Sequence, residues 1–244
     1  MLTKCKAIII KSIDYSESSV IVKCFTNHYG MQSYLINGVR KQKGAIRPSQ
    51  LLPLSLLNLE AYHQQNKNLQ RIKELRCEPQ LKQLHFQMTK SAIGMFIAEV
   101  IYRAVKEENH PDSQLFEFLF QFIQLLDEED EQALSNLPLY FLLQIARLMG
   151  IAPKFENVGT GTLGFNFKDG QFEWYDDKNP FQFSLVSSEL LMLCLPAGYN
   201  EIREMQIAGV HRRQLIQDIL IYFNEHISGF SNMKSHEILA TVLA

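Results

Sequence analysis

The stretch CKAIIIKSIDYSESSVIVKCFTNHYG, residues 5–30, decides the fold of the first part of the chain. Two runs rich in β-branched residues lie on either side of the polar turn Asp14–Glu17, a pattern typical of two strands joined by a short loop. Three further strand-like runs follow, MQSYLING, PLSLLNLEAYHQ and LQRIKELRCE, and the last ends at Glu78. Five strands in about 75 residues predict a small closed barrel, because closure leaves no exposed sheet edge. The count leaves the type of barrel open, and an SH3-like barrel fits it almost as well.

After Pro79 the apolar residues recur at spacings of three and four, as the buried face of a helix requires. The pattern includes Leu81, Leu84, Met88, Ile93, Phe96, Ile97, Val100 and Ile101, and His85 falls in it as well. A second helix is expected after Asp112, and a third from roughly Gln132 to Met149, where Gly150 and Pro153 form a stop signal.

The segment from Lys154 to Phe183 interrupts this helical pattern with four glycines, and its GFNF and QFEWY runs predict a short hairpin. Helices resume near Ser187–Cys194, Gly209–His226 and Ser235–Leu243. We therefore expect a mixed, two-domain protein. An all-β barrel occupies residues 1–79, and an α-helical domain with a small β-hairpin insertion at about 154–183 occupies residues 80–244.

The net charge is uneven along the chain. As a whole the chain carries −2 with a pI near 6.4, which disfavours nucleic-acid binding. Residues 1–79, however, hold twelve Lys and Arg against five Asp and Glu, a net charge of +7, and the remainder holds twelve against twenty-one, a net charge of −9. This asymmetry indicates an anion-binding module joined to an acidic one. The alternative is two solvated surfaces that happen to differ.

Composition and cysteine usage indicate a globular, reduced protein. With 46% hydrophobic and 20% charged residues, the chain is not expected to be disordered. Its four cysteines lack the spacing of a zinc site, and we expect buried thiols in a reducing cytosol. No secretory leader or long apolar segment is apparent, so we expect a cytoplasmic protein that does not bind a membrane.

No constellation of catalytic residues is apparent. GTGTLG at residues 159–164 lacks the spacing and the following Lys of a phosphate-binding loop. The five consecutive carboxylates Asp127–Glu131 point around a helix end and cannot converge on one cation, so they predict a solvated acidic loop. We expect no enzyme activity, no metal and no cofactor.

The loop NGVRKQKGAIRPSQLLP is the most informative basic segment. It places four cations within eight positions, where they could follow a phosphate backbone: Arg40, Lys41, Lys43 and Arg47. Single-strand binding also needs aromatic rings on which bases stack, and Tyr15, Tyr29, Tyr34 and Tyr62 are available in the same module. Aromatic rings in small barrels are also often core residues. Tyr34 and Tyr62 are the first stacking candidates.

Several stretches resemble one known family. CKAIIIKSIDYSESSVIVKCFTNHYG, LINGVRKQKG and LLPLSLLNLE resemble the N-terminal domain of the bacterial RecO recombination and repair proteins. LPLYFLLQIARLMGIAPKF and YFNEHISGFSNMKSHEIL resemble the helical domain and C-terminal end of the same family. The resemblance spans nearly the whole chain.

The resemblance implies an OB-fold followed by a helical domain, without catalytic activity. It implies a recombination mediator in double-strand break and gap repair through the RecF pathway, which binds single- and double-stranded DNA, anneals complementary strands, associates with RecR and helps RecA displace the single-stranded DNA-binding protein SSB. The basic positions that match the family pattern are Arg40, Lys41 and Lys43, with Arg47 nearby. Many relatives hold zinc with four cysteines after the stretch matching GIAPKF; here ENVGTGTLGFNFKDGQFEWYDD has none, so no metal is inferred.

The SSB tail is acidic and ends in apolar residues, so its receiving site needs a hydrophobic groove with a cation at the rim. Arg147, Arg212 and Arg213 are the candidates, against the simpler reading of ordinary surface arginines. An alternative function of a different class is a protein-interaction scaffold whose basic barrel binds an acidic partner.

Overall fold

The computed structural model describes residues 1–39, 46–64, 67–105, 110–154 and 161–243. The chain divides into two compact units, Met1–Glu128 and Glu129–Ala244. The sequence-based boundary after residue 79 falls between the strands and helices of the first unit, and as a domain boundary it stays a prediction.

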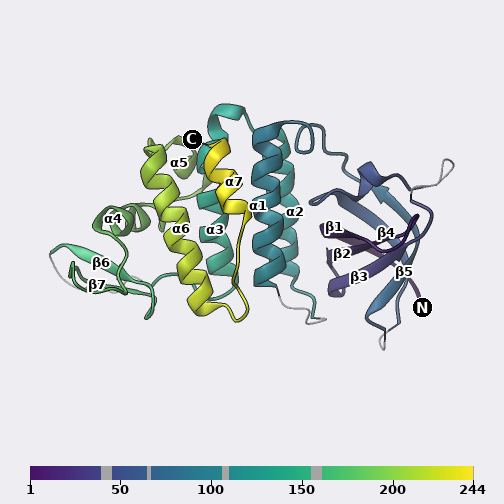
Figure 1. The fold of residues 1–244 in the computed structure, drawn as a ribbon, viewed down its shortest axis with the longest axis horizontal. Helices are drawn as coiled ribbons and strands as arrows, with labels where there is room; N and C mark the ends of the chain where they lie inside the picture. The colour runs from purple at the N-terminus through teal and green to yellow at the C-terminus, as the bar shows by residue number, and fades with distance from the viewer. Residues whose placement is uncertain (40–45, 65–66, 106–109, 155–160, 244) are drawn as a thin grey trace. The chain divides into compact units, whose positions relative to one another are not determined.

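The first unit begins with a closed five-stranded barrel of strand order β1-β2-β3-β5-β4 (Figure 1). The strands are β1 (Leu2–Asp14), β2 (Val20–Thr26), β3 (Gly30–Ile36), β4 (Leu56–Tyr62) and β5 (Leu69–Cys77). β1 is long enough to pair twice: residues 2–8 pair with β4 and residues 7–14 with β2. β5 lies antiparallel to β4 and parallel to β3, which closes the barrel. This is the Greek-key closure of an OB-fold, and it confirms the predicted fold class.

Alternating residues of every strand fill the barrel, as a period of two requires. Each of these side chains is at most 7% exposed: Cys5, Ala7, Ile9, Val20, Val22, Cys24, Tyr34, Ile36, Leu57, Leu59, Ala61 and Leu75. The short helix η1 (Pro48–Leu51) closes one end, because Leu51 joins the same core and its carbonyl accepts a hydrogen bond from Ser12 Oγ.

Two helices, α1 (Met88–Ala104) and α2 (Ser113–Glu128), complete the first unit and lie side by side (Figure 1). They cover part of the barrel's outer surface. Phe25 of β2 packs on Phe116 of α2 with ring centroids 6.0 Å apart, and the Lys6 ammonium lies 5.0 Å from the centre of the Phe120 ring. The barrel and these helices therefore share apolar contacts.

Asp127, near the end of α2, fixes the segment that leads from the barrel into α1. Its carboxylate accepts hydrogen bonds from the backbone amides of residues 82, 83 and 84 at 2.7 to 2.8 Å. The fully buried Lys90 donates to the Asp127 carbonyl at 2.7 Å and to Gln83 Oε1 at 2.8 Å. The expectation of a solvated acidic loop was wrong for Asp127, which is only 6% exposed, because the unpaired amides of that segment need an acceptor.

The second unit is helical and contains the predicted hairpin. Its elements are η2 (Glu131–Asn136), α3 (Leu137–Leu148), β6 (Leu163–Asn166), β7 (Gln171–Trp174), α4 (Leu185–Cys194), α5 (Tyr199–Glu204), α6 (Gly209–His226) and α7 (Ser235–Val242). The turn between β6 and β7 places Gly170 at a φ of 70°, a conformation that glycine adopts without strain. The Phe165 ring of β6 then packs on Phe183 and on Tyr222 of α6. Within the described ranges, none of the helices has the length and apolar character needed to cross a membrane.

Candidate nucleic-acid interface

One register row of outward-facing side chains runs across all five strands of the barrel. Strand pairing joins Ile13 to Ile21, Ile21 to Leu35, Leu35 to Arg71, Arg71 to Tyr62 and Tyr62 to Leu2. We call these six residues the outer row. Tyr62 is 48% exposed, Ile13 40% and Leu2 38%, Arg71 is exposed, and Ile21 and Leu35 are half-buried. The outer row therefore combines an aromatic ring, aliphatic surface and a guanidinium group.

A second row lies next to it on β1, β2 and β3, two residues further along each strand. Lys11 is directly opposite Lys23, and Lys23 is opposite Ser33. Both ammonium groups lie over the ring of Tyr102 on α1, at 4.9 Å and 5.3 Å from its centre. The two rows together contain three cations, Lys11 on β1, Lys23 on β2 and Arg71 on β5.

This arrangement has the chemistry of single-strand binding. Cations that neutralise phosphates and apolar or aromatic surfaces on which bases stack are the two requirements, and neither depends on base sequence. In OB-folds, the face formed by the second and third strands is the one that binds oligonucleotides. Asp14 is next to Ile13 in β1, and Glu60 lies two residues from Tyr62 in β4, where it pairs with Lys73 at 3.2 Å.

The residues just before the predicted basic loop lie at one end of this face. Just before the loop, the Val39 amide donates to the Ser18 carbonyl at 2.8 Å, and Ser19 Oγ bonds Asn37 Oδ1 at 3.0 Å. The β1–β2 turn at this end also carries Tyr15, which is 61% exposed. Arg40, Lys41 and Lys43 lie outside the described residues. Arg47 is exposed, and its backbone amide donates to Gln50 Oε1 at 2.8 Å.

Tyr34 and Tyr62 have opposite placements. Tyr62 is in the outer row, beside Arg71. Tyr34 is 1% exposed and lies in the barrel core, where burial and the neighbouring Cys5 and Cys24 raise its pKa. The expectation that Tyr34 offers a stacking surface is corrected: its side chain points inward because it pairs with the inward residues Val22 and Gln70. Tyr29 stacks on His63 with ring centroids 3.9 Å apart.

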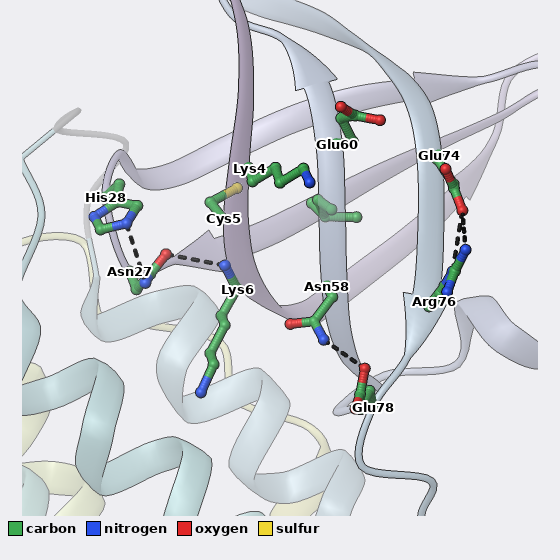
Figure 2. Close-up of a pocket in the computed structure, with 11 residues that line it drawn as sticks. Lys4, Cys5, Lys6, Asn27, His28, Asn58, Glu60, Glu74, Arg76 and Glu78 are labelled. Carbon is green, nitrogen blue, oxygen red and sulfur yellow. Dashed lines mark hydrogen bonds and ion pairs between the residues drawn. The ribbon is translucent and has the colours of Figure 1, made fainter.

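A groove of about 510 Å³ lies on another part of the barrel surface, lined mainly by residues of β1, β4 and β5 (Figure 2). Three cations and three carboxylates line it: Lys4, Lys6, Arg76, Glu60, Glu74 and Glu78. Arg76 pairs with Glu74 at 2.8 Å, and Glu78 accepts from Asn58 Nδ2 at 2.8 Å (Figure 2). Because the formal charges of these six residues balance, the groove offers a polyanion much less attraction than the two rows do. We therefore place the candidate interface on the rows and not in the groove.

The three arginines proposed for partner binding are in different settings. Arg147 is exposed and donates to the Leu195 carbonyl. Arg212 is only 8% exposed, and it donates to the carbonyls of Ile207 at 3.1 Å and Leu243 at 3.3 Å. Burial, and then the charge of Arg213, lower the pKa of Arg212. Arg212 is thus an internal structural residue.

Arg213 is half-buried and lines a small groove between α6 and α7. The groove's apolar lining is formed by Ile216, Leu239, Ala240 and Leu243, and Arg147 is not part of it. Arg212 also lines this groove but is nearly buried, so Arg213 is the one of the three arginines that borders the apolar groove without being enclosed.

Four interface residues were not singled out from the sequence: Lys11, Lys23, Arg71 and Tyr102. The three cations had been counted in the positive charge of residues 1–79. The alternation of side chains along a strand could have identified the three cations, because each lies an even number of residues from another outward-facing residue of its strand. Tyr102 left no such signal, because its place over β1 and β2 depends on how α1 packs.

Comparison with known proteins identifies the family. The model of the "Recombination protein O N terminal" domain matches residues 1–79, and that of the "Recombination protein O C terminal" domain matches residues 85–236. The chain belongs to the RecO family. This confirms the resemblance found in the sequence and assigns this RecO protein a role in DNA repair and recombination.

Full-length relatives agree with this assignment. The DNA repair protein RecO of Azobacteroides pseudotrichonymphae genomovar. CFP2 is 33% identical, with 99% of each chain covered. The RecO proteins of Christiangramia forsetii and Flavobacterium johnsoniae are 31% and 30% identical, with 98% and 100% of each chain covered. The likeness to these relatives therefore extends over nearly the whole of each aligned chain.

Proposed function

We propose that this RecO protein is a non-enzymatic recombination mediator that binds single-stranded DNA on the outer row and the adjacent lysine row. The observation that carries the proposal is the continuity of the outer row, which sets Tyr62, Arg71 and the Ile21–Leu35 surface in one register across the strands. Bases would stack on Tyr62 and lie on the aliphatic surface, while Arg71, Lys11 and Lys23 neutralise phosphates. Double-stranded DNA would bind the same cations through its backbone alone.

Annealing follows from the same chemistry. Two complementary strands repel each other through their phosphates, and a protein that neutralises some of these charges lowers the repulsion. The basic loop with Arg40, Lys41, Lys43 and Arg47 would add cations at the end of the face where Tyr15 is exposed. Neither annealing nor assistance to another protein requires a catalytic group.

The second unit would meet the protein partners in the cytoplasm, namely RecR and the tail of SSB. An acidic peptide with apolar terminal residues requires an apolar surface with a cation beside it, and the lining of the α6–α7 groove with Arg213 has this chemistry. Competing contacts with DNA and with SSB would then help RecA to replace SSB. Arg147 is a second, separate candidate for the acidic tail, and titration of Arg147→Ala and Arg213→Ala with a tail peptide distinguishes the two.

The proposal is tested by fluorescence anisotropy of a labelled oligonucleotide at several salt concentrations. Tyr62→Ala should weaken binding by about five- to 150-fold, since stacking contributes about 1–3 kcal/mol per base. The logarithm of the binding constant falls linearly with the logarithm of the salt concentration, and we call this gradient the salt slope. Arg71→Gln should lower its magnitude by about 0.7, the value for one phosphate contact on a single strand. Changing Arg40, Lys41 and Lys43 together to Ala should lower it further.

Lys4→Gln is the matched control, because it removes one charge from β1 outside the two rows. Unchanged affinity and slope in both Tyr62→Ala and Arg71→Gln would remove the rows from the site. A wild-type chain that does not bind the oligonucleotide at low salt would instead favour the scaffold whose basic barrel binds an acidic partner.

A further inference from the structure

A recess of about 280 Å³ lies at the end of the barrel that η1 closes. Its apolar lining includes Ile10 of β1, Val20 of β2, Val39, and Leu51 and Leu52 in the segment before β4. We propose that this recess binds one base of single-stranded DNA that has left the stack of its neighbours. The inference rests on the proposed function, and it names the part of the ligand that the recess takes.

The strand register explains why the core leaves space here. Ser12 is directly opposite Val22, which lies in the barrel core, and opposite residues on paired strands share a face of the sheet. Ser12 therefore occupies an inward position with a short polar side chain, and its hydroxyl donates to the Leu51 carbonyl at 2.5 Å. The register of β1 also shifts between Ile9 and Lys11, and such a bulge bends the strand. The mouth of the barrel is therefore less completely filled than its middle.

The recess offers both kinds of contact that a base needs. Leu51 is buried and Leu52 is 38% exposed, so the apolar lining extends from the core to the surface, and it suits the flat face of a base. On β1, pairing with β4 ends at Ile8, and Ile9 bonds the backbone of residues 54 and 55. Beyond Ile9, no strand among the described residues covers this edge of β1. A strand edge presents backbone N–H and C=O groups, which are suitable partners for the polar edge of a base.

The recess is continuous with the candidate interface. Val20 of its lining is next in sequence to Ile21 of the outer row. Lys11 lines the recess as well, and it belongs to the adjacent lysine row. A base in the recess would therefore belong to a strand whose neighbouring bases contact the outer row, with a cation beside it for the phosphate. Asp14 also lines the recess, but it takes part in another interaction and is not assigned to the base.

The size of the recess favours a single strand over a duplex. Pockets that enclose drug-sized ligands have volumes of about 300–1,000 Å³, so a recess of about 280 Å³ suits one base and not a base pair. A base in a duplex would first have to unpair and unstack, which costs free energy. The cations of the interface bind the backbone of either form. The recess would therefore supply a part of the affinity that only a single strand receives.

Leu52 and Ser49 allow the recess to be tested with a charge-matched control. Leu52→Glu places a carboxylate in the apolar lining, at a residue that is partly exposed and can be replaced without opening the core. Ser49 is an exposed residue of η1 that does not line the recess, and Ser49→Glu adds the same charge nearby. Both variants repel the phosphate backbone to a similar extent, so the difference between them reports on the recess.

The experiment is fluorescence anisotropy with three labelled ligands: a single strand, the same strand with abasic sites in place of its bases, and a duplex. For the single strand, Leu52→Glu should bind about fivefold or more weakly than Ser49→Glu, the lower end of the contribution of one base. This ratio should not change with salt, because the base carries no charge. For the abasic strand and the duplex, the two variants should bind equally, since neither ligand presents a free base.

Equal binding of the single strand by the two variants would overturn the inference and leave an apolar side chain of a protein partner as the occupant of the recess. An additional loss in Leu52→Glu that is as large on the abasic strand would overturn it too, because the base would then have no part in the effect. Far-UV circular dichroism checks the fold. If Leu52→Glu does not fold, Leu52→Gln and Ser49→Gln replace the pair.

Tyr62→Ala and Arg71→Gln are measured in parallel on the single strand, which separates the recess from the rest of the interface. If they weaken binding while the Leu52 and Ser49 variants bind equally, only the role of the recess fails. If they are without effect as well, the proposed interface itself fails.

Discussion

At the residue scale, Asp218 of α6 is a carboxylate that the fold buries without pairing both of its oxygens. It is 7% exposed, and Oδ1 accepts a hydrogen bond from Gln214 Nε2 at 2.9 Å. Oδ2 has no hydrogen-bond partner among the residues that the structure describes. Burial raises the pKa of Asp218, and the hydrogen bonds from Ser187 and Gln214 oppose this only in part.

This gives a prediction about pH. A carboxyl group whose pKa is raised by folding favours the folded state while it is protonated, and it loses that advantage as the pH rises above its unfolded value of about 3.9. Asp218→Asn has no such ionisation. The free energy of unfolding of the variant, minus that of the wild type, should therefore increase between about pH 4 and pH 7. Urea denaturation of both proteins at both pH values measures this difference. A difference that stays constant with pH would mean that Asp218 is not the titrating group.

The tyrosines show what residue type alone does not reveal. Both Tyr34 and Tyr62 were reasonable stacking candidates, because each lies in a strand of a basic module. Which ring faces solvent depends on the phase of the strand, and a slip of one residue reverses it. β1 has an irregularity between Ile9 and Lys11, and β5 another opposite Glu60 and Ala61, so the phase cannot be counted from one end of the sequence.

At the element scale, Asp127 connects α2 to the beginning of α1. Burial alone would raise its pKa, but three backbone hydrogen bonds and the charge of Lys90 outweigh this and lower it. The carboxylate thus acts as an acceptor for amides that precede the helix. The sequence showed only a run of five acidic residues, and nothing in it indicated that the first of them would be buried.

Asp127→Asn should lower the free energy of unfolding at pH 7 by about 2 kcal/mol, since an amide group cannot accept all three hydrogen bonds and a buried donor is left unpaired. The sign of the pH dependence is opposite to that of Asp218. A lowered pKa contributes stability above the unfolded pKa, and this is lost as the pH falls through the folded value. The difference in free energy of unfolding between variant and wild type, measured by urea denaturation, should be largest near neutral pH and should disappear below about pH 4. A gap that persists in acid would show that the ionised form has no special role.

Most of the elements could be predicted from local pattern, and the site could be predicted only in part. The five strands, the helices after Pro79 and the hairpin at Leu163–Trp174 follow from periodicity and from glycine and proline signals. The interface could not be assembled in this way, because Arg71 and Leu35 become neighbours through the parallel β3–β5 pair. Such a non-local pairing leaves no mark in the spacing of residues. The place of Tyr102 depends on helix packing, which periodicity does not give.

At the scale of the whole molecule, the charge asymmetry persists when the chain is divided at its compact units. Residues 1–128 hold sixteen Lys and Arg against twelve Asp and Glu, a net charge of +4, and residues 129–244 hold eight against fourteen, a net charge of −6. α1, α2 and their flanking residues dilute the positive charge of the barrel without reversing it. The unit that contains the candidate DNA interface is thus positive as a whole.

The first unit should also be the smallest fragment that folds well. Phe25 and Met31 point outward from the barrel yet are only 1% and 5% exposed, and Phe25 packs on Phe116 of α2. A fragment of residues 1–79 would expose both side chains, at a cost of roughly 3–6 kcal/mol. We expect residues 1–128 to unfold in one cooperative thermal transition and residues 1–79 to melt at a clearly lower temperature, both followed by circular dichroism. Equal melting temperatures would make the sequence-based boundary after residue 79 the true folding boundary.

The double pairing of β1 has a consequence for how the chain is made. Residues 2–8 pair with β4, which begins at Leu56, so this half of β1 has no strand partner on that side until β4 has left the ribosome. An unpaired strand edge is a template for another chain, and charged side chains on it discourage such pairing. Lys4 and Lys6 are exposed on this half of the strand. These two lysines, which take no part in the proposed DNA interface, would protect the newly synthesised protein from aggregation while its barrel is still open.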